Sequence, residues 1–434
     1  MRDLVMAVAM LGFVYLAFSS SLVAYLLWGW TAFVAINFYL YGFMASFQFN
    51  MLFAVVSLAM LALSKDPDKQ PFSPNRVSIL FMLFAVQATL TFVFALEGSI
   101  QSYFFWTLIL KVLLFGILMP MIITTRVRIY AMVVTLTLGL AMHGVVEGGK
   151  FINSGGGHHV IGLPKFGDNN HFALLVVMGM PLLIYMFQHS VSKLVKLGTV
   201  FGLIFSVAAV IGTHSRGGLL SMMLAGGWLV WSSRRKAVGI AALIAGAVII
   251  VATAPESWSE RMNTIKTAEE DSSFMGRVEA WKVSTAIALA RPLTGGGFHG
   301  VEHRSVWVEY RDAPSLLSGV ETPYTLAGRA AHSAYFEVLG DTGFVGLLLF
   351  LIILLMPFLA RNEIRRLSKA YGPGLIWASD LADTLSAVMF AYVVGAAALS
   401  VAYFEALYAI VMLMETLRQY VLRTVAAGPS GGAL

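Results

Sequence analysis

Residues 77–96 read VSILFMLFAVQATLTFVFAL and contain no charged side chain. About 20 apolar residues in a helix cross the ~30 Å hydrocarbon core of a bilayer. The runs at 197–213 and 344–360 approach the same length, and all three are continuous instead of alternating. Only helices and closed barrels satisfy their backbone hydrogen bonds within hydrocarbon, and continuous runs favour helices. The sequence therefore predicts an all-α polytopic membrane protein.

Composition supports this prediction, because the 434 residues are 58% hydrophobic and only 12% charged. Soluble domains carry roughly 25% charged residues. The chain has no cysteine, which excludes disulfides, thiolate zinc sites and cysteine-ligated iron–sulfur clusters. We expect no nucleic-acid partner from the net charge of +6, since basic residues in a membrane protein first report topology. Residues 1–20 resemble a signal peptide but are expected to stay as a helix.

Basic residues gather in five short loops, which we expect to face the cytoplasm. Together the loops hold 14 of the 29 Lys and Arg residues. Their bounds are 64–76, 124–128, 189–196, 232–236 and 361–369. Consecutive loops up to residue 236 are separated by enough apolar sequence for two helices. The pattern predicts about 12 transmembrane helices, with one uncertain at each end.

The segment 255–334 holds 18 of the 52 charged residues and should lie in water. We interpret it as a large, partly helical periplasmic loop over a membrane cavity. The predicted organisation is an N-terminal transmembrane bundle at 1–254, this loop domain at 255–334, and C-terminal transmembrane helices with a short tail at 335–434. The loop is the expected place for chemistry.

A first polar motif, THSRGG at 213–218, lies between two predicted helices on the outward side. One interpretation is that the Arg216 side chain only extends along apolar surface to place its guanidinium at the membrane–water boundary. Gly217 and Gly218 favour a functional interpretation, because they let the backbone approach a ligand and a helix start offers free N–H groups to an anion. The role of the neighbouring His214 stays open.

A second motif, SFMGRVEAW at 273–281, begins a predicted helix that runs to residue 290. Arg277 lies near its first turn, where it could bind an anion or pair with Glu279 or Asp271. The glycine run in 292–300 suits a tight turn or backbone contact with a ligand, although a glycine cluster alone is weak support.

A third motif, AHSAYF at 331–336, lies where the loop re-enters the membrane. The imidazole of His332 has an ordinary pKa of about 6.5, so it can accept a proton at neutral pH from a lipid-borne substrate. The alternative is a helix cap or a residue at the headgroup level. Four other histidines, His158, His159, His171 and His303, are less well placed.

Several further residues have charged or polar side chains that could act in chemistry. Asp66-Pro67-Asp68 resembles a metal-binding acidic pair, but its place between two lysines in a cytoplasmic loop indicates a solvated turn. Lys111 and Glu405 are costly charges within apolar sequence, so each should face a cavity or a partner. His299 and Arg304 in the long loop are possible secondary site residues. No metal site can be paired by spacing.

The order of these motifs resembles the O-antigen ligase superfamily, which also includes O-antigen polymerases and some protein O-oligosaccharyltransferases. The resemblance is carried by 215–218, by Gly276, Arg277 and Trp281, by the run 292–300, and by 332–346. The opening residues 1–4 are also similar to ligase-like proteins associated with exosortase systems.

The resemblance implies a glycosyltransferase of the Gram-negative inner membrane with its active site facing the periplasm. It would move a glycan from undecaprenyl diphosphate to a hydroxyl of lipid A-core oligosaccharide in lipopolysaccharide biosynthesis, without a metal or other cofactor. Arg216 and Arg277 match the family positions that bind the donor diphosphate, and His332 matches the proposed base for a single displacement with inversion. Arginine forks suit phosphate oxygens.

Three alternatives stay open. The chain could be a polymerase of the same superfamily, or a ligase whose acceptor is a protein or exopolysaccharide. From another class, it could be a transporter of lipid-linked glycans. A transporter should carry its key charges within the membrane, where Lys111 and Glu405 are placed.

Overall fold

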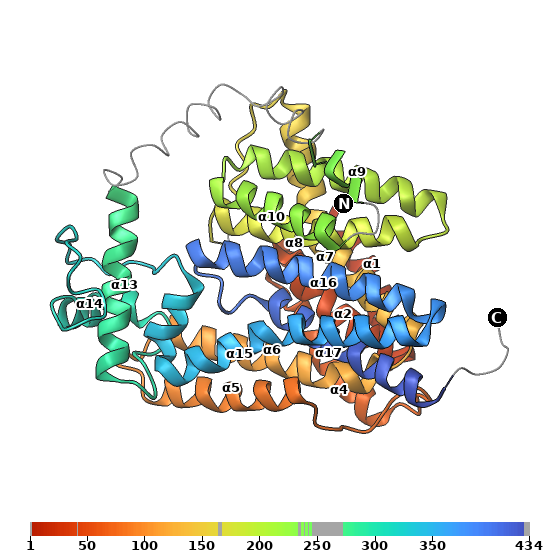
Figure 1. Cartoon of the computed structure of the whole chain (residues 1–434), viewed down its shortest axis with the longest axis horizontal. Helices are drawn as coiled ribbons and strands as arrows, with labels where there is room; N and C mark the ends of the chain where they lie inside the picture. Colours follow the sequence, from red (N-terminus) through yellow and green to blue (C-terminus); the bar gives the residue numbers. More distant parts are fainter. Residues whose placement is uncertain are drawn as a thin grey trace.

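The computed structural model describes residues 2–40, 42–163, 167–232 and 272–428, with a few more between 236 and 244. Within these ranges most residues lie in helices and none lies in a strand. The helices pack into a bundle, and α13 and α14 lie together at one end of it (Figure 1). The α-helices are α1 Arg2–Ser19, α2 Ser21–Val34, α3 Gly42–Ser46, α4 Phe49–Leu63, α5 Arg76–Val93, α6 Ile100–Ile122, α7 Arg126–Asn153, α8 Asn169–His189, α9 Lys193–Gly212, α10 Arg216–Ser232, α13 Ser272–Ala290, α14 Arg304–Tyr310, α15 Ala334–Tyr371, α16 Ile376–Gly395 and α17 Glu405–Ala426. Short 3-10 turns are η1 Ile36–Tyr39, η4 Gly300–Glu302, η5 Pro373–Leu375 and η6 Ala396–Ala398.

Within the described ranges, 7 helical segments are long and apolar enough to cross a membrane. Three shorter apolar helices lie at Leu4–Ser19, Ser21–Val34 and Phe49–Leu63. The seven are Arg76–Val93, Ile100–Ile122, Arg126–Asn153, Asn169–His189, Lys193–Gly212, Ala334–Tyr371 and Pro373–Ala398. The chain is thus a multi-pass, all-helical membrane protein, while the expected total of about 12 spans stays a prediction.

The turns that the sequence predicts to face outward meet at one end of the bundle, which we name the loop end. Leu96 N–H donates to the Gly296 carbonyl at 2.9 Å, and Val160 N–H donates to the Gly212 carbonyl at 2.9 Å. The loop end thus gathers the segments 94–99, 154–163, 213–215, 291–300 and 396–404.

The loops predicted to be cytoplasmic meet at the opposite end, which we name the basic end. Thr124 Oγ1 donates to the Asp68 carbonyl at 2.8 Å, and Arg423 Nη2 donates to the Thr124 carbonyl at 3.2 Å. Arg361 reaches both Asp383 and Ser232 there. Segments that share a predicted side therefore share an end of the bundle.

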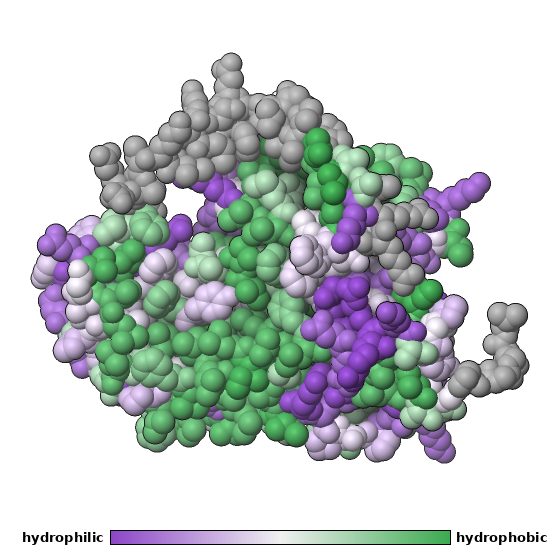
Figure 2. Space-filling model, viewed as in Figure 1, coloured by the Kyte–Doolittle hydropathy of each residue, from purple (hydrophilic) through white to green (hydrophobic). Residues whose placement is uncertain are grey.

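A hydrophobic surface separates the two ends. On the face drawn in Figure 2, it covers the region of α5 and α15 and is bounded by hydrophilic residues, on one side near α14 and on the other by a strongly hydrophilic patch. The surface includes exposed side chains such as Ile79, Val86, Leu348 and Leu355. Such a wide apolar face is the expected contact with lipid.

The glycine run anchors the loop domain to α15. Gly343 inside α15 has φ 71°, and the break lets Phe344 N–H donate to the Pro292 carbonyl at 2.9 Å. A side chain at Gly295, whose φ is 66°, would collide with the Asp341 carbonyl. Backbone contact with a ligand was one expectation for this run, but the close approach that it permits is to the backbone of α15.

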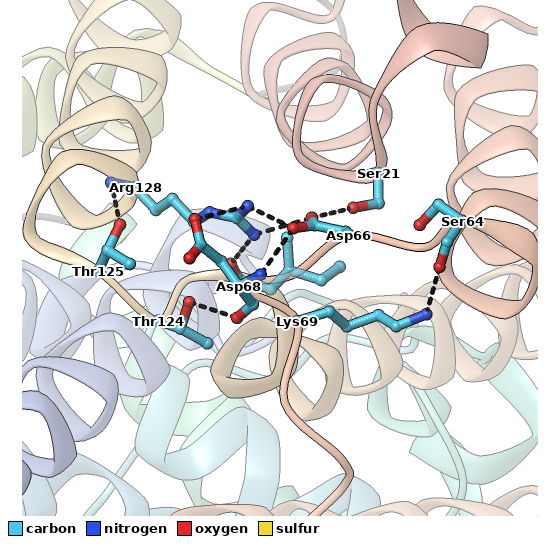
Figure 3. Close-up of polar contacts among 9 residues, drawn as sticks. Ser21, Ser64, Asp66, Asp68, Lys69, Thr124, Thr125 and Arg128 are labelled. Atoms are coloured by element: carbon cyan, nitrogen blue, oxygen red, sulfur yellow. Dashed lines mark hydrogen bonds and ion pairs between the residues drawn. The ribbon is translucent and has the colours of Figure 1, made fainter.

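The acidic pair at the basic end is an ion-paired anchor, so the predicted solvated turn is wrong for Asp66 (Figure 3). Arg128 Nη2 and Nη1 lie 2.6 and 3.0 Å from the two Asp66 carboxylate oxygens, and Ser21 Oγ donates to the same group at 2.6 Å. The Asp66 and Arg128 side chains are each only 10% exposed. Asp66 therefore joins α2 to α7 and has its oxygens occupied by protein partners.

Replacing Asp66 by Asn should destabilise the protein, because Arg128 would keep its charge without its bidentate partner. We expect a loss of about 1–3 kcal/mol and a Tm lower by a few degrees. Tryptophan fluorescence during heating in detergent measures it. The Arg128 hydrogen bonds hold the pKa of Asp66 at about 2, so the contribution is complete above about pH 4 and disappears as the pH falls toward 2.

Asp68→Asn is the matched control, because Asp68 contacts the same guanidinium at 3.1 Å but is 49% exposed. It should lower the Tm clearly less than Asp66→Asn. Equal effects of the two variants, or none, would contradict the anchoring role.

The absence of native cysteine allows a direct test of sidedness. Val191 is 99% exposed in a loop predicted to be cytoplasmic, and Leu316 is 62% exposed in the predicted periplasmic loop. In intact spheroplasts a membrane-impermeant maleimide should label Leu316→Cys and leave Val191→Cys unlabelled until the cells are lysed. The reverse pattern would invert the topology.

Candidate functional site

His332 lies in the turn that leads into α15. Its backbone has φ 45°, a left-handed conformation that few non-glycine residues adopt. The ring is partly buried, and Nδ1 has no hydrogen-bond partner among the described residues. A buried nitrogen of this kind has hydrogen-bonding capacity that a substrate or a water molecule can use.

Arg277 lies in the first turns of α13 and within electrostatic range of His332. Its side chain is partly buried, and Nε has no hydrogen-bond partner in the described part of the chain. No contact of the described residues joins Arg277 to Glu279, which instead faces Arg311 at 3.8 Å. Arg277 Nε and His332 Nδ1 are therefore two nitrogens that lack a hydrogen-bond partner among the described residues, on side chains within electrostatic range of each other.

The turn that carries Arg216 is held against α8. Ser215 Oγ accepts from Gly218 N–H at 3.0 Å, which closes the start of α10. A side chain at Gly218 would press on Ala173 of α8, whereas one at Gly217 would meet nothing within 4 Å. Gly218 is thus needed for packing, and Gly217 leaves the backbone beside Arg216 open.

The start of α8 connects the polar motifs, although its sequence alone indicates no functional role. Asp168 caps the helix by accepting from His171 N–H at 2.9 Å, and His171 Nδ1 donates to the same carboxylate at 2.7 Å. Asn169 Nδ2 donates to the Thr213 carbonyl at 2.7 Å, next to the Arg216 turn. Asp168 and His171 both lie within electrostatic range of His332.

The start of α8 contacts two other segments of the loop end. Asn169 bonds the turn between α9 and α10, and His171 Nε2 lies 3.2 Å from the Ser400 carbonyl before α17. The signal available in the sequence was the run Asp168-Asn169-Asn170 before an apolar stretch, which is typical of a helix N-terminus. That pattern predicts a helix start but not its neighbours.

The electrostatic environment favours His332 over His299 as a base. Burial, and then the charge of Arg277, lower the pKa of His332, so its ring is neutral at pH 7. Burial opposes protonation of His299 as well, but a 2.6 Å bond to Glu302 and the nearby carboxylates raise the pKa of His299 to about 9. His299 is therefore already protonated at neutral pH.

His299 belongs to a buried ionic cluster that fastens the loop domain to the bundle. Its backbone N–H donates to Asp341 at 2.9 Å, and Nε2 lies 3.5 Å from Glu337. Tyr403 donates to the other Asp341 oxygen at 2.8 Å. The cluster joins the glycine run, α15 and the segment before α17, which is a structural task.

The other predicted residues are scattered. Arg304 is the first residue of α14 and is exposed, and no contact of the described residues joins it to His332. Lys111 on α6 is exposed, and the cavity or partner expected for it stays a prediction. Glu405 is the first residue of α17, at the loop end. His214 has φ 53° and stacks on His159 at 5.1 Å between ring centroids.

Comparison with protein families divides the chain into two matched segments. Residues 201–351 match the model described as O-Antigen ligase, and residues 1–191 match a family of unknown function (DUF5935). No curated protein matches the chain. Arg216, Arg277 and His332 all lie in the first-named segment, whereas Asp168 and His171 lie in the other.

Proposed function

We propose that the chain, whose residues 201–351 match the O-antigen ligase family, transfers a glycan from undecaprenyl diphosphate to a hydroxyl of lipid A-core oligosaccharide at the periplasmic face of the inner membrane. The family match and the apolar helices support glycan transfer in a membrane. The identities of the donor and the acceptor, and the roles of the individual residues, are what we propose in addition.

One observation supports the site above all. His332 and Arg277 are electrostatic neighbours, and each keeps a buried nitrogen without a hydrogen-bond partner among the described residues. The reaction needs a neutral base beside a cation that binds phosphate. This arrangement supplies both at the boundary between the loop domain and the start of α15.

In the proposed reaction, His332 accepts the proton of the acceptor hydroxyl as its oxygen attacks the anomeric carbon. The new glycosidic C–O bond forms while the C–O bond to the diphosphate breaks from the opposite face. The electron pair leaves with the diphosphate oxygen, so the configuration at that carbon inverts. The carrier diphosphate and a protonated imidazole are the other products.

Arg277 and Arg216 bind the diphosphate and stabilise the charge that grows on it. An arginine fork binds two phosphate oxygens at once, and such preorganised charge is a large source of rate acceleration. Arg216 comes from the turn that Asn169 ties to α8, and Arg277 comes from α13. Their meeting around one diphosphate is part of the proposal.

Removing the proposed base or a diphosphate ligand should abolish most transfer without unfolding the protein. We expect about 10²–10⁴-fold loss in His332→Ala and about 10²–10³-fold loss in Arg277→Ala and Arg216→Ala. Purified protein would be assayed in EDTA with an undecaprenyl diphosphate-linked oligosaccharide and lipid A-core acceptor.

His303→Ala is the control, because this loop histidine contacts Ser99 at 3.2 Å and not the site. It should retain transfer. Full activity in both His332→Ala and Arg216→Ala would refute the mechanism, and loss of all transfer in EDTA would refute its metal independence.

The pH dependence tests the environment of His332. Because burial and Arg277 lower its pKa, kcat/KM should fall on the acid side with a midpoint below about 6.5. Arg277→Gln removes a positive charge, so the midpoint of its residual activity should rise. A wild-type midpoint above 6.5, or no shift in the variant, would contradict this account.

The acceptor separates the proposal from a polymerase of the same family. If the chain is a ligase, deleting its gene removes all glycan from lipid A-core and lipid-linked polymer accumulates. If it is a polymerase, single repeats remain on the core. If the acceptor is a protein or an exopolysaccharide, deleting the gene leaves the glycan attached to lipid A-core unchanged.

A further inference from the structure

We infer that Trp281 is a positioning residue that fixes the His332 turn against Arg277. The inference rests on the proposed function for its catalytic meaning, although its geometry stands alone. Trp281 lies on α13 four residues after Arg277, so the two side chains share one face of that helix.

Trp281 contacts the chain on both sides of His332. Its indole Nε1–H donates to the Ala331 carbonyl at 2.7 Å. Its ring stacks on Phe336, with centroids 4.8 Å apart and planes 10° from parallel. A single side chain therefore binds the residue before His332 and packs on the residue four positions after it.

The His332 turn needs such support. Its left-handed backbone, at φ 45°, is disfavoured by crowding of the side chain. No partner in the described part of the chain holds the ring at Nδ1, and Ser333 makes no side-chain cap to α15. The backbone conformation therefore contributes to the orientation of the imidazole, and Trp281 of α13 bonds the carbonyl next to it.

The consequence is a fixed relation between base and cation. Arg277 and Trp281 move together because one helix carries both, and Trp281 holds the carbonyl adjacent to His332. A loosened Ala331 contact would leave Arg277 in place and let His332 drift. Small misplacements of a reacting group lower the rate far more than they weaken binding.

Trp281→Phe tests this inference, because phenylalanine keeps an aromatic ring for Phe336 and removes the N–H donor. Trp307→Phe is the matched control in the same domain. Trp307 Nε1–H donates to the Thr325 carbonyl at 2.9 Å, so its substitution also deletes a partly buried indole hydrogen bond.

Two readouts are needed for each variant. The first is steady-state transfer, with kcat separated from the KM for the undecaprenyl diphosphate-linked oligosaccharide. The second is the rate at which diethyl pyrocarbonate modifies His332 between pH 5 and 8, followed by peptide mass spectrometry. The second readout requires no catalytic activity.

In Trp281→Phe we expect kcat to fall about tenfold or more while the donor KM changes less than about threefold. The rate or pH midpoint of His332 modification should also change. Trp307→Phe should leave the kcat-to-KM balance and His332 modification as in the wild type. Wild-type modification of His332 in Trp281→Phe, or the same response in both variants, would overturn the inference.

A second variant covers the case in which Trp281→Phe does not fold. Phe336→Leu removes the ring on which Trp281 stacks, so the indole that bonds Ala331 loses one of its two contacts. It should also change the rate or pH midpoint of His332 modification, and unchanged modification would overturn the inference. If His332→Ala retained full transfer, the proposed role of His332 as the base would fail, yet modification of His332 in the Trp281 variants would still decide whether Trp281 positions that residue.

Discussion

The arrangement of the proposed site depends on the hydrogen bonds that the Asp168 carboxylate makes at the start of α8. The carboxylate caps α8 through backbone N–H groups and holds the His171 ring at 2.7 Å. The same helix start bonds the Thr213 carbonyl and the Ser400 carbonyl, so α10 and α17 begin at fixed positions around it. Asp168 and His171 also lie within electrostatic range of His332.

Two kinds of interaction then share the work of holding the loop domain. The backbone of the run 292–300 bonds α15 at the break around Gly343. The buried cluster around His299 adds hydrogen bonds to Asp341 of the same helix. Trp281 acts closer to the proposed chemistry, at the carbonyl before His332. The pKa of the proposed base, His332, is thus lowered and its turn is bonded by Trp281, whereas His299 is bound by Glu302.

Sequence alone predicted the features that local composition determines. Apolar runs predicted the helices, basic loops predicted which turns share an end, and the motif of His332 was located at the start of α15. It did not predict that Asp66 pairs with Arg128, because these residues are 62 positions apart and the acidic pair looked solvated. The packing task of Gly295 and the exposure of Lys111 likewise depend on tertiary neighbours, which periodicity and charge do not specify.

The central claim is that Arg216 and Arg277 bind one diphosphate beside His332. The most direct measurement is a structure of the full chain in lipid nanodiscs with undecaprenyl diphosphate bound. The account predicts the diphosphate between the two guanidinium groups, with the His332 ring facing the side opposite the leaving group. A diphosphate bound elsewhere, or a His332 ring turned away from both arginines, would contradict it.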